Sequence, residues 1–278
     1  MIAKYVCSNG KEYNLIGATF RVMSGNFHKS TWKAKATQME TGDKLYGFTK
    51  ESIAYSLTFT MRGPLDQRKK NLDEIEAAFE YDIANVSPGR FWCGDYYADG
   101  YIRETDIEKS GTWNTWTDIK ATLYCPYPLW VKEHKKSFYP EDRNCGEAYE
   151  FLEYPYDYLY DYSRQKSGSQ NWIIDHFKKS NFKMIIYGPC TDPRITINGH
   201  VYQIYDTLES SDYVVIESRD KKITKHLANG TTQNILFKRR KDVSVFEPLP
   251  FGNLLINWNG EFGFDITAYL ERSVPEWI

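Results

Sequence analysis

Asn-Gly dipeptides constrain this chain more than any other feature, because each marks a place where one strand can turn tightly into the next. They occur at Asn9-Gly10, Asn198-Gly199, Asn229-Gly230 and Asn259-Gly260. A two-residue hairpin needs positive φ at both central positions, and Asn followed by Gly adopts this backbone at little cost. Strand-like residues flank these turns. We therefore predict a mostly β protein with hairpins at the dipeptides.

Two further patterns support a β fold. Aromatic residues make up 16% of the chain, and such side chains fit well on the pleated surface of a sheet. Apolar and polar residues alternate over residues 53–60, which predicts a strand. Three or four strands are expected between residues 18 and 62, one of them with Trp32, Ala34 and Ala36 on one face. After residue 181, short apolar runs separated by turn residues indicate a sandwich or jelly roll.

One helix is predicted, over residues 64–84. Pro64 suits a first helical turn, and Asp66 complements the positive end of the helix dipole. Apolar residues recur at spacings of 7, 3, 4 and 4, which places them on one helical face. They are Leu65, Leu72, Ile75, Phe79 and Ile83. We expect this helix to cover the opening of a barrel or sandwich; a helix that binds a partner is the alternative.

Residues 123–133 are expected to form a stiff junction between two domains. Pro126 and Pro128 each lack an N–H and restrict the preceding residue, so the stretch is predicted to be neither a helix nor the middle of a sheet. Its aromatic side chains, such as Trp130, disfavour a solvated loop. The alternative is an edge strand, interrupted by prolines, within one domain.

The length of the chain is typical of about two domains. We expect an N-terminal β domain with the helix over residues 1–133, a connector over residues 134–180 and a C-terminal β-sandwich over residues 181–278. Tyrosines are interleaved with acids over residues 149–162, and tyrosine-rich surfaces are enriched at interfaces. The connector is therefore expected to lie against a neighbour, with a covered strand edge as the alternative.

Composition argues against several classes of protein. Lys and Arg number 35 against 37 Asp and Glu, whereas nucleic-acid-binding proteins have a basic excess, so no specific nucleic-acid binding is expected. No apolar run approaches the roughly 20 residues that span a bilayer, and the first residues do not resemble a leader, so we expect a soluble protein without a cleaved leader. The 5 cysteines are widely spaced without a Cys-x-x-Cys pair, which indicates free or buried thiols in a reducing compartment.

No catalytic constellation stands out in the sequence. The histidines are His28, His134, His176, His200 and His226, and no two of them have a spacing typical of metal ligands. Nucleophile-elbow, P-loop and dinucleotide motifs are also missing. We therefore expect no catalytic residues, no metal site and no cofactor, and a protein that is not an enzyme.

Two features are candidate binding surfaces, each with a simpler explanation beside it. Trp113 and Trp116 lie in a predicted turn and could form an exposed platform, although turn aromatics are more often buried. The run Lys-Arg-Arg-Lys at residues 238–241 could meet phosphate or an acidic partner, although a solvated strand end explains it as well.

Several segments occur together in a recognisable order. They are Tyr-Pro-Leu-Trp-Val (127–131), Tyr-Pro-Tyr-Asp-Tyr (154–158), Gly-Pro-Cys-Thr-Asp-Pro-Arg-Ile-Thr-Ile (188–197), Val-Phe-Glu-Pro-Leu-Pro-Phe-Gly-Asn (245–253), Leu-Ile-Asn-Trp-Asn-Gly-Glu-Phe-Gly-Phe-Asp-Ile (255–266) and Glu-Arg-Ser-Val-Pro-Glu-Trp (271–277). In this order the chain resembles the distal tail protein family of phages with long, flexible tails (siphophages) and of related prophages. One departure is Ser273-Val274-Pro275, where an acid is expected before the proline.

The resemblance implies an N-terminal β-barrel or sandwich with a packed helix, followed by a C-terminal galectin-like jelly roll. It also implies that six copies form a ring at the distal end of the tail tube, in the virion tail tip, after synthesis in the host cytoplasm. This ring would join the tail tube protein to the tail-tip protein and, in some phages, to a receptor-binding protein. DNA would pass through its central channel.

Two other functions compete with this one. The alternative is a carbohydrate-binding module that contacts host cell-wall glycans, since galectin-like sandwiches bind sugars and Trp258 or Trp277 could stack on a pyranose. Trp258 alternates with Leu254 and Ile256, however, and is expected in the core. The third function is a cell-wall hydrolase, for which no pair of acids is singled out.

Overall fold

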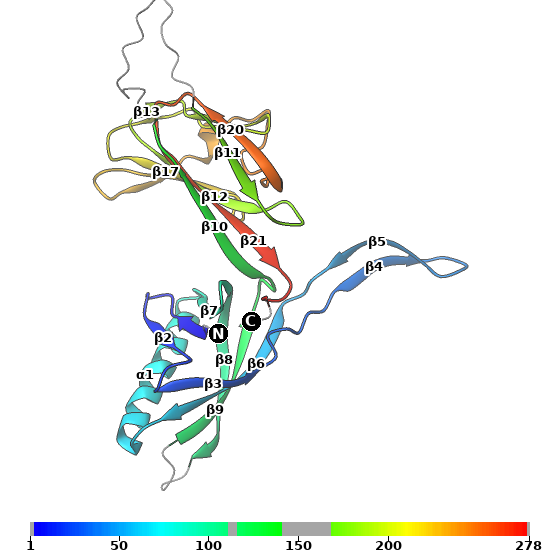
Figure 1. Ribbon diagram of the computed structural model, residues 1–278, viewed down its shortest axis with the longest axis vertical. Coiled ribbons are helices and arrows are strands. Elements are labelled where there is room, and N and C mark those ends of the chain that lie inside the picture. Colours follow the sequence, from blue (N-terminus) through cyan, green and yellow to red (C-terminus); the bar gives the residue numbers. More distant parts are fainter. Residues whose placement is uncertain (1–2, 111–115, 141–167, 277–278) are drawn as a thin grey trace, which may run out of the picture. The chain divides into compact units, whose positions relative to one another are not determined.

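The computed structural model describes residues 3–110, 116–140 and 168–276, and antiparallel strands dominate it (Figure 1). The described residues contain one α-helix, so the predicted mostly β fold with a helix is confirmed. The chain forms two compact units. Unit 1 comprises Met1–Lys132 and Glu271–Ile278, and unit 2 comprises Glu133–Leu270. The chain leaves unit 1 within β10 (Trp130–Phe138) and returns to it within β21 (Phe264–Arg272).

Unit 1 contains two sheets that share one long strand. Its elements are β1 (Ala3–Val6), β2 (Glu12–Asn14), β3 (Phe20–Gly25), β4 (Lys33–Gln38), β5 (Asp43–Thr49), β6 (Ile53–Arg62), α1 (Leu65–Ala84), β7 (Gly89–Cys93), β8 (Tyr96–Ser110) and β9 (Trp116–Cys125). The strand orders are β2–β1–β7–β8 and β3–β6–β9–β8. Its core contains many buried aromatic side chains, among them Tyr55, Phe59 and Phe91.

Strand β8 changes partner at Gly100, pairing with β7 up to this residue and with β9 from Tyr101 onward. A Cβ at Gly100 would lie 2.7 Å from the carbonyl oxygen of Tyr124. Because the interior is close-packed, that backbone would have to move. We expect Gly100→Ala to lower the free energy of unfolding by about 1–3 kcal/mol in urea titrations. Gly47→Ala is the control, because a Cβ there meets no atom within 4 Å, and equal effects of the two substitutions would contradict the argument.

The proline-containing stretch differs in part from its prediction. Strand β9 extends to Cys125 and lies between β6 and β8, so residues 123–125 are in the middle of a sheet. The prediction was wrong there because Pro126 restricts the residue before it to an extended backbone, which a strand already has. Only residues 126–129 run between β9 and β10. The chain passes from unit 1 into unit 2 soon after them.

The expected domain boundaries stay predictions. Within the expected connector, residues 134–180, the described part includes the end of β10 and all of β11 (Gly168–Ile174), and both belong to unit 2. The tyrosine-rich residues 149–162 lie outside the described residues.

Helix α1 occupies the predicted range, with Pro64 as its N-cap residue. Ile75 and Phe79 are buried as expected, but Leu65 and Ile83 are exposed. The predicted apolar face is therefore wrong at both ends, because the polar side chains of Arg68 and Asp82 are buried there instead. No helix in the described part of the chain has the length and apolar character needed to cross a membrane.

Unit 2 is a two-layer antiparallel sandwich. Besides parts of β10 and β21 and all of β11, it contains β12 (Asn181–Tyr187), β13 (Cys190–Thr191), β14 (Arg194–Ile197), β15 (His200–Gln203), β16 (Thr207–Leu208), β17 (Tyr213–Glu217), β18 (Lys222–His226), β19 (Thr232–Asn234), the 3₁₀ helix η1 (Leu236–Lys238) and β20 (Gly252–Trp258). One layer has the order β19–β18–β17–β12–β21–β10 and the other β11–β20–β14–β15. Buried side chains of both layers, such as Phe182 and Ile256, form one core.

Three of the Asn-Gly dipeptides lie in hairpin turns as predicted, but only Asn198-Gly199 has the expected positive φ at both positions. Asn9-Gly10 joins β1 to β2, Asn229-Gly230 joins β18 to β19, and Asn198-Gly199 joins β14 to β15 with φ of 46° and 84°. The hairpin predicted at Asn259-Gly260 does not form, because β20 belongs to one layer and β21 to the other. There the chain crosses between layers, and both Trp258 and Phe264 face the core.

Candidate assembly surfaces

Asp82 of α1 is the most heavily bonded buried polar side chain of unit 1 in the described residues, and the sequence analysis missed it. Its side chain is 1% exposed. It accepts hydrogen bonds from the Tyr5 hydroxyl, from Cys7 Sγ at 3.1 Å, and from the Ser8 amide and hydroxyl at 2.8 and 2.6 Å. Burial and the bond to Asp82 raise the pKa of Tyr5 far above its ordinary value, so the hydroxyl keeps its proton and donates. Asp82 thus anchors α1 to β1 and the turn after it.

Arg68 anchors the other end of α1. It is 3% exposed, and its Nη1 donates to the Trp116 carbonyl at 2.7 Å and to Thr117 Oγ1 at 2.5 Å. With Asp82, it holds the inner face of the helix against the strands. Only the outer face of α1 is therefore available to a partner.

The tryptophans singled out from the sequence have different environments. Trp258 is 5% exposed and its Nε1 donates to the Phe262 carbonyl at 3.2 Å, so its expected place in the core is confirmed. Trp116 is half-buried in β9, and its carbonyl accepts the hydrogen bond from Arg68, so it does not form an open platform. Trp113 and Trp277 lie outside the described residues.

Two of the four basic residues at 238–241 pair with nearby acids. Lys238 pairs with Asp206 at 2.8 Å, and Arg240 pairs with Asp242 at 2.6 Å. Arg239 Nη1 donates to the Leu236 carbonyl at 2.7 Å. The run lies at the end of η1 and in the loop after it, and half of its positive charge is offset by nearby acids.

Three of the histidines make hydrogen bonds or ring contacts in separate parts of unit 2. His134 Nε2 accepts a hydrogen bond from Trp172 Nε1 at 2.8 Å, and His226 stacks on Tyr213 with 4.5 Å between ring centroids. His200 Nε2 lies 2.8 Å from the Ser244 carbonyl. In the part of the chain that the structure describes, no three metal-ligating side chains come together.

Four cysteines are described, Cys7, Cys93, Cys125 and Cys190, and all are free thiols as predicted. The first three are buried. Burial raises the pKa of Cys125 to about 12, so this thiol is unreactive near neutral pH. Cys145 lies outside the described residues.

Strands β4 and β5 form an isolated hairpin, residues 33–49, which pairs with no other described strand. It projects from unit 1 (Figure 1), and all of β4 is exposed. The strand expected with Trp32, Ala34 and Ala36 therefore exists, but its apolar face is not in the core. Large apolar side chains on and next to the hairpin are more than half exposed, namely Trp32, Met39, Leu45, Tyr46 and Phe48. An isolated two-stranded ribbon is marginally stable, and exposed apolar patches mark interaction sites.

The two faces of the hairpin differ. Opposite residues of paired strands point to the same face. Ala34 pairs with Phe48 and Ala36 with Leu45, so these side chains share an apolar face. Lys33, Lys35 and Lys44 lie on the other face, since Lys44 is opposite Thr37.

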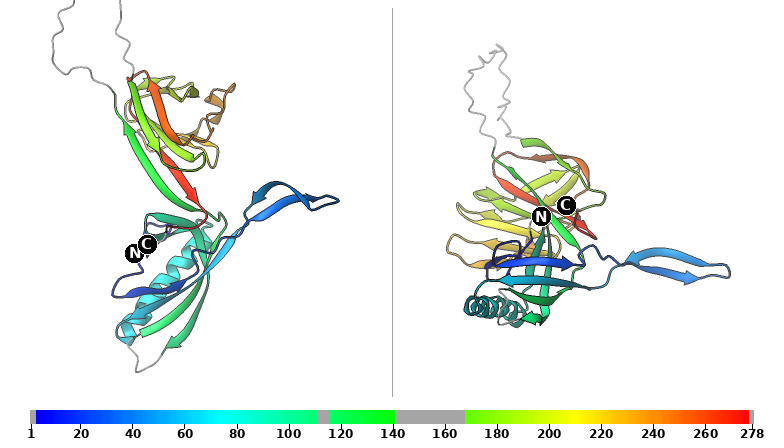
Figure 2. Two further views of the ribbon diagram at one scale, coloured as in Figure 1. Left: turned by 45° about the vertical axis from the view of Figure 1, so that its right-hand side comes forward. Right: turned by 60° about the horizontal axis from the view of Figure 1, so that its bottom comes forward.

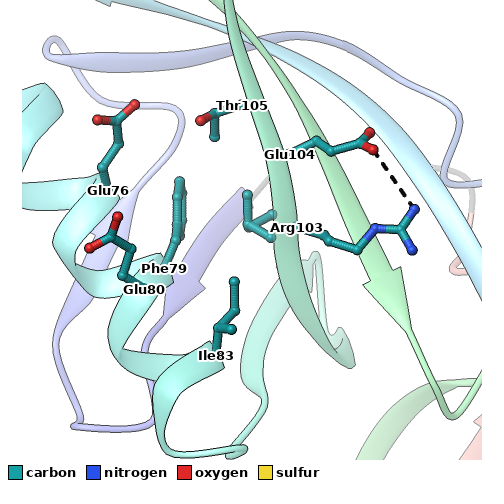
Figure 3. Close-up of a pocket in the computed structure, with 8 residues that line it drawn as sticks. Glu76, Phe79, Glu80, Ile83, Arg103, Glu104 and Thr105 are labelled. Carbon is teal, nitrogen blue, oxygen red and sulfur yellow. Dashed lines mark ion pairs between the residues drawn. The ribbon is translucent and has the colours of Figure 1, made fainter.

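A groove of about 320 Å³ lies between α1 and β8 (Figure 3). Helix α1 contributes Glu76, Phe79, Glu80 and Ile83, and β8 contributes Ile102, Arg103, Glu104 and Thr105. Glu76 and Glu80 lie on the helix side, whereas the side chains of Arg103 and Glu104 extend away from α1, where they lie 4.0 Å apart (Figure 3). We call this surface the acidic groove.

Solved structures share this fold along its whole length. The crystal structure of the SPP1 Dit (gp 19.1) protein, described as a paradigm of the hub adsorption apparatus in phages that infect Gram-positive bacteria, aligns with a TM-score of 0.61. The alignment covers 98% of this chain and 100% of that one, at 8% identity. A chain of the phage P2 baseplate in its activated conformation aligns with a TM-score of 0.62 at 12% identity, in both the Ca and the Sr form. That alignment covers 99% of this chain and at least 99% of the other.

The chain has the fold of a phage tail hub protein. At these identities the likeness establishes the fold, and both units are included in the alignment. No family model matches the sequence, and no curated protein matches it.

Proposed function

We propose that this protein is a structural component of the tail tip of a long-tailed phage or prophage, where six copies form a hub ring at the end of the tail tube. The observation that supports this most is the alignment with the SPP1 hub protein and the P2 baseplate chain over nearly the whole of each chain. A hub acts through shape and contact, and needs no reacting group.

The hairpin supports self-association. Its apolar side chains are exposed in a single copy, and their burial against a neighbour removes them from water. The hairpin extends from the side of unit 1 opposite to α1, as the views of Figure 1 and Figure 2 agree. A contact between two different sides of identical copies is head-to-tail, and such contacts close into a ring when the rotation permits.

The partners follow from this role. We propose that the N-terminal domain forms the ring and that the galectin-like C-terminal domain lies outside it. The ring joins the tail tube protein to the tail-tip protein, and in some phages to a receptor-binding protein. A formal net charge of −2 suits a DNA channel, because a strongly basic wall would bind phosphates and slow passage.

Sedimentation of the full chain tests this proposal. We expect a hexamer, formed by the protein alone or after addition of the tail tube and tail-tip proteins. Native mass spectrometry gives the number of copies. A species that stays monomeric and binds neither tail protein contradicts the hub.

A carbohydrate-binding module remains the second candidate, because of the sandwich fold of unit 2. The burial of Trp258 removes one of its two proposed stacking residues. We expect no signal on a glycan array or in a cell-wall pull-down, and specific binding of a glycan would favour this candidate.

A further inference from the structure

Two side-chain hydrogen bonds join the outermost strands of the unit 2 sandwich. Within unit 2, β10 is the outermost strand of one layer and β11 that of the other. Lys136 Nζ of β10 donates to the Asn171 carbonyl of β11 at 2.6 Å. Trp172 Nε1 of β11 donates to His134 Nε2 of β10 at 2.8 Å. Both bonds run from one layer to the other, so they help to hold this side of the sandwich closed.

The bond between Trp172 and His134 requires a neutral imidazole. An indole N–H can only donate, so His134 Nε2 must present its lone pair and the ring must have its proton on Nδ1. A protonated imidazole has an N–H at both nitrogens and no lone pair on either. Turning the ring over therefore does not restore the bond once His134 is protonated.

The burial of Trp172 makes the loss of this bond costly. Its side chain is 4% exposed, so water does not readily replace the lost acceptor. A buried donor without a partner costs more than a hydrogen bond contributes when it is made. The imidazole and indole planes are 15° apart, and their centroids are separated by 5.3 Å. The closed sandwich therefore fits the neutral form of His134 and not the charged form.

The charges on the same face of β10 also oppose protonation of His134. Side chains alternate along a strand, so Lys132 and Lys136 share the face of His134. The charge of Lys132 is offset by Asp95 at 2.9 Å, whereas Lys136 is bound to an uncharged carbonyl. A further positive charge on His134 is repelled by Lys136.

The neighbouring strands provide no carboxylate on this face in the part of the chain that the structure describes. By the same alternation, Glu133, Asp265 and Glu271 lie on the opposite faces of β10 and β21. Asp265 is paired there with Lys135 at 2.8 Å. The core-facing residues are uncharged, namely Gln170, Trp172 and Ile174 on β11 and Phe264, Ile266, Ala268 and Leu270 on β21.

We infer that His134 and Trp172 form a pH-sensitive latch, which holds β10 and β11 together at neutral pH and releases them when His134 is protonated. The open form binds the proton more readily than the closed form, so a fall in pH favours the open form. Histidine changes its charge between about pH 8 and about pH 5, which sets the range of the response. The latch adds a second state of unit 2 to the proposed hub and does not depend on the ring.

Hydrogen exchange of the full chain, measured by mass spectrometry at about pH 7.5 and about pH 5.5, tests the latch. The rates are corrected for the intrinsic effect of pH on exchange. We expect the amides of β11 and of residues 133–138 to exchange about tenfold faster or more at the lower pH, because a buried bond is lost. The amides of β14 and β15, on the other side of the same layer from β11, should show no such change.

Two variants locate the effect at the bond. In His134→Gln the side-chain carbonyl can accept from Trp172 and does not titrate, so exchange at β11 should stay slow at both pH values. In Trp172→Phe the donor is missing, so exchange should already be faster at the higher pH and should change little in acid. The control is His200→Gln, because His200 Nε2 lies 2.8 Å from the Ser244 carbonyl and can still donate to it when protonated. This variant should keep the acid response of β11.

Three results would overturn the latch. In the unaltered chain, β11 exchanges equally fast at both pH values, or acid accelerates β14 and β15 as strongly as β11. In the variant, His134→Gln keeps the full acid response. The first two measurements use the unaltered chain, so they decide the question even where a substitution prevents folding.

Discussion

Asp82→Ala is expected to lower the free energy of unfolding by about 3–5 kcal/mol, the largest single-residue effect in unit 1. The substitution leaves the Tyr5 hydroxyl, the Cys7 thiol and both donors of Ser8 without their shared acceptor. Buried donors that lose their partner cost far more than a hydrogen bond contributes when made. Urea denaturation of the full chain, followed by circular dichroism, measures the change.

Two variants sharpen this test. Asp82→Asn keeps one carbonyl acceptor and should cost less than the alanine substitution. Asp73→Ala removes an exposed acid from the same helix and should change stability by no more than about 0.5 kcal/mol. If Asp82→Ala costs as little as Asp73→Ala, the buried network does not anchor the helix.

Replacing Leu45 and Phe48 together by serine is expected to weaken assembly by about tenfold to a hundredfold. Each side chain is more than half exposed in one copy, so little folding energy is lost. Full burial of a large apolar side chain contributes about 1.5–3 kcal/mol, of which a half-exposed side chain has about half still to gain, and each 1.4 kcal/mol changes an affinity tenfold. Sedimentation velocity over a series of protein concentrations measures the shift.

The matched control is Ile173→Ser with Phe237→Ser, two exposed apolar side chains of unit 2. These substitutions should leave assembly unchanged, because neither residue lies on the hairpin. Normal assembly of the Leu45 and Phe48 variant would show that the apolar face of the hairpin is not part of the interface.

Local signals in the sequence predicted local structure well. The helix over residues 64–84 was found because Pro64 and the apolar spacing act within a few turns. Three Asn-Gly hairpins were found because turn preference is local, although only Asn198-Gly199 has positive φ at both residues. The fourth prediction failed because the layer of a strand depends on its pairing partners. Strand β20 pairs with β11 and β14, whereas β21 pairs with β12 in the other layer, and these partners are distant in the sequence.

The spacing of residues in α1 contains a weak signal that Asp82 is buried. Asp82 follows Ile75 by seven residues and therefore lies on the apolar face of the helix, where an acid needs a partner. The identity of that partner could not be read, because Tyr5 and Ser8 are more than 70 residues away in the chain. The same holds for Arg68 and the start of β9.

By itself, the sequence determined the β-rich class, the position of the helix and the turns with special backbone, since these depend on residues close together in the chain. The tertiary structure alone decided which apolar faces are buried. The alternation at Trp32, Ala34 and Ala36 is that of a core strand, yet β4 pairs only with β5 and is exposed. Burial depends on what lies opposite a strand in space, and this hairpin is a separate ribbon that pairs with no other described strand.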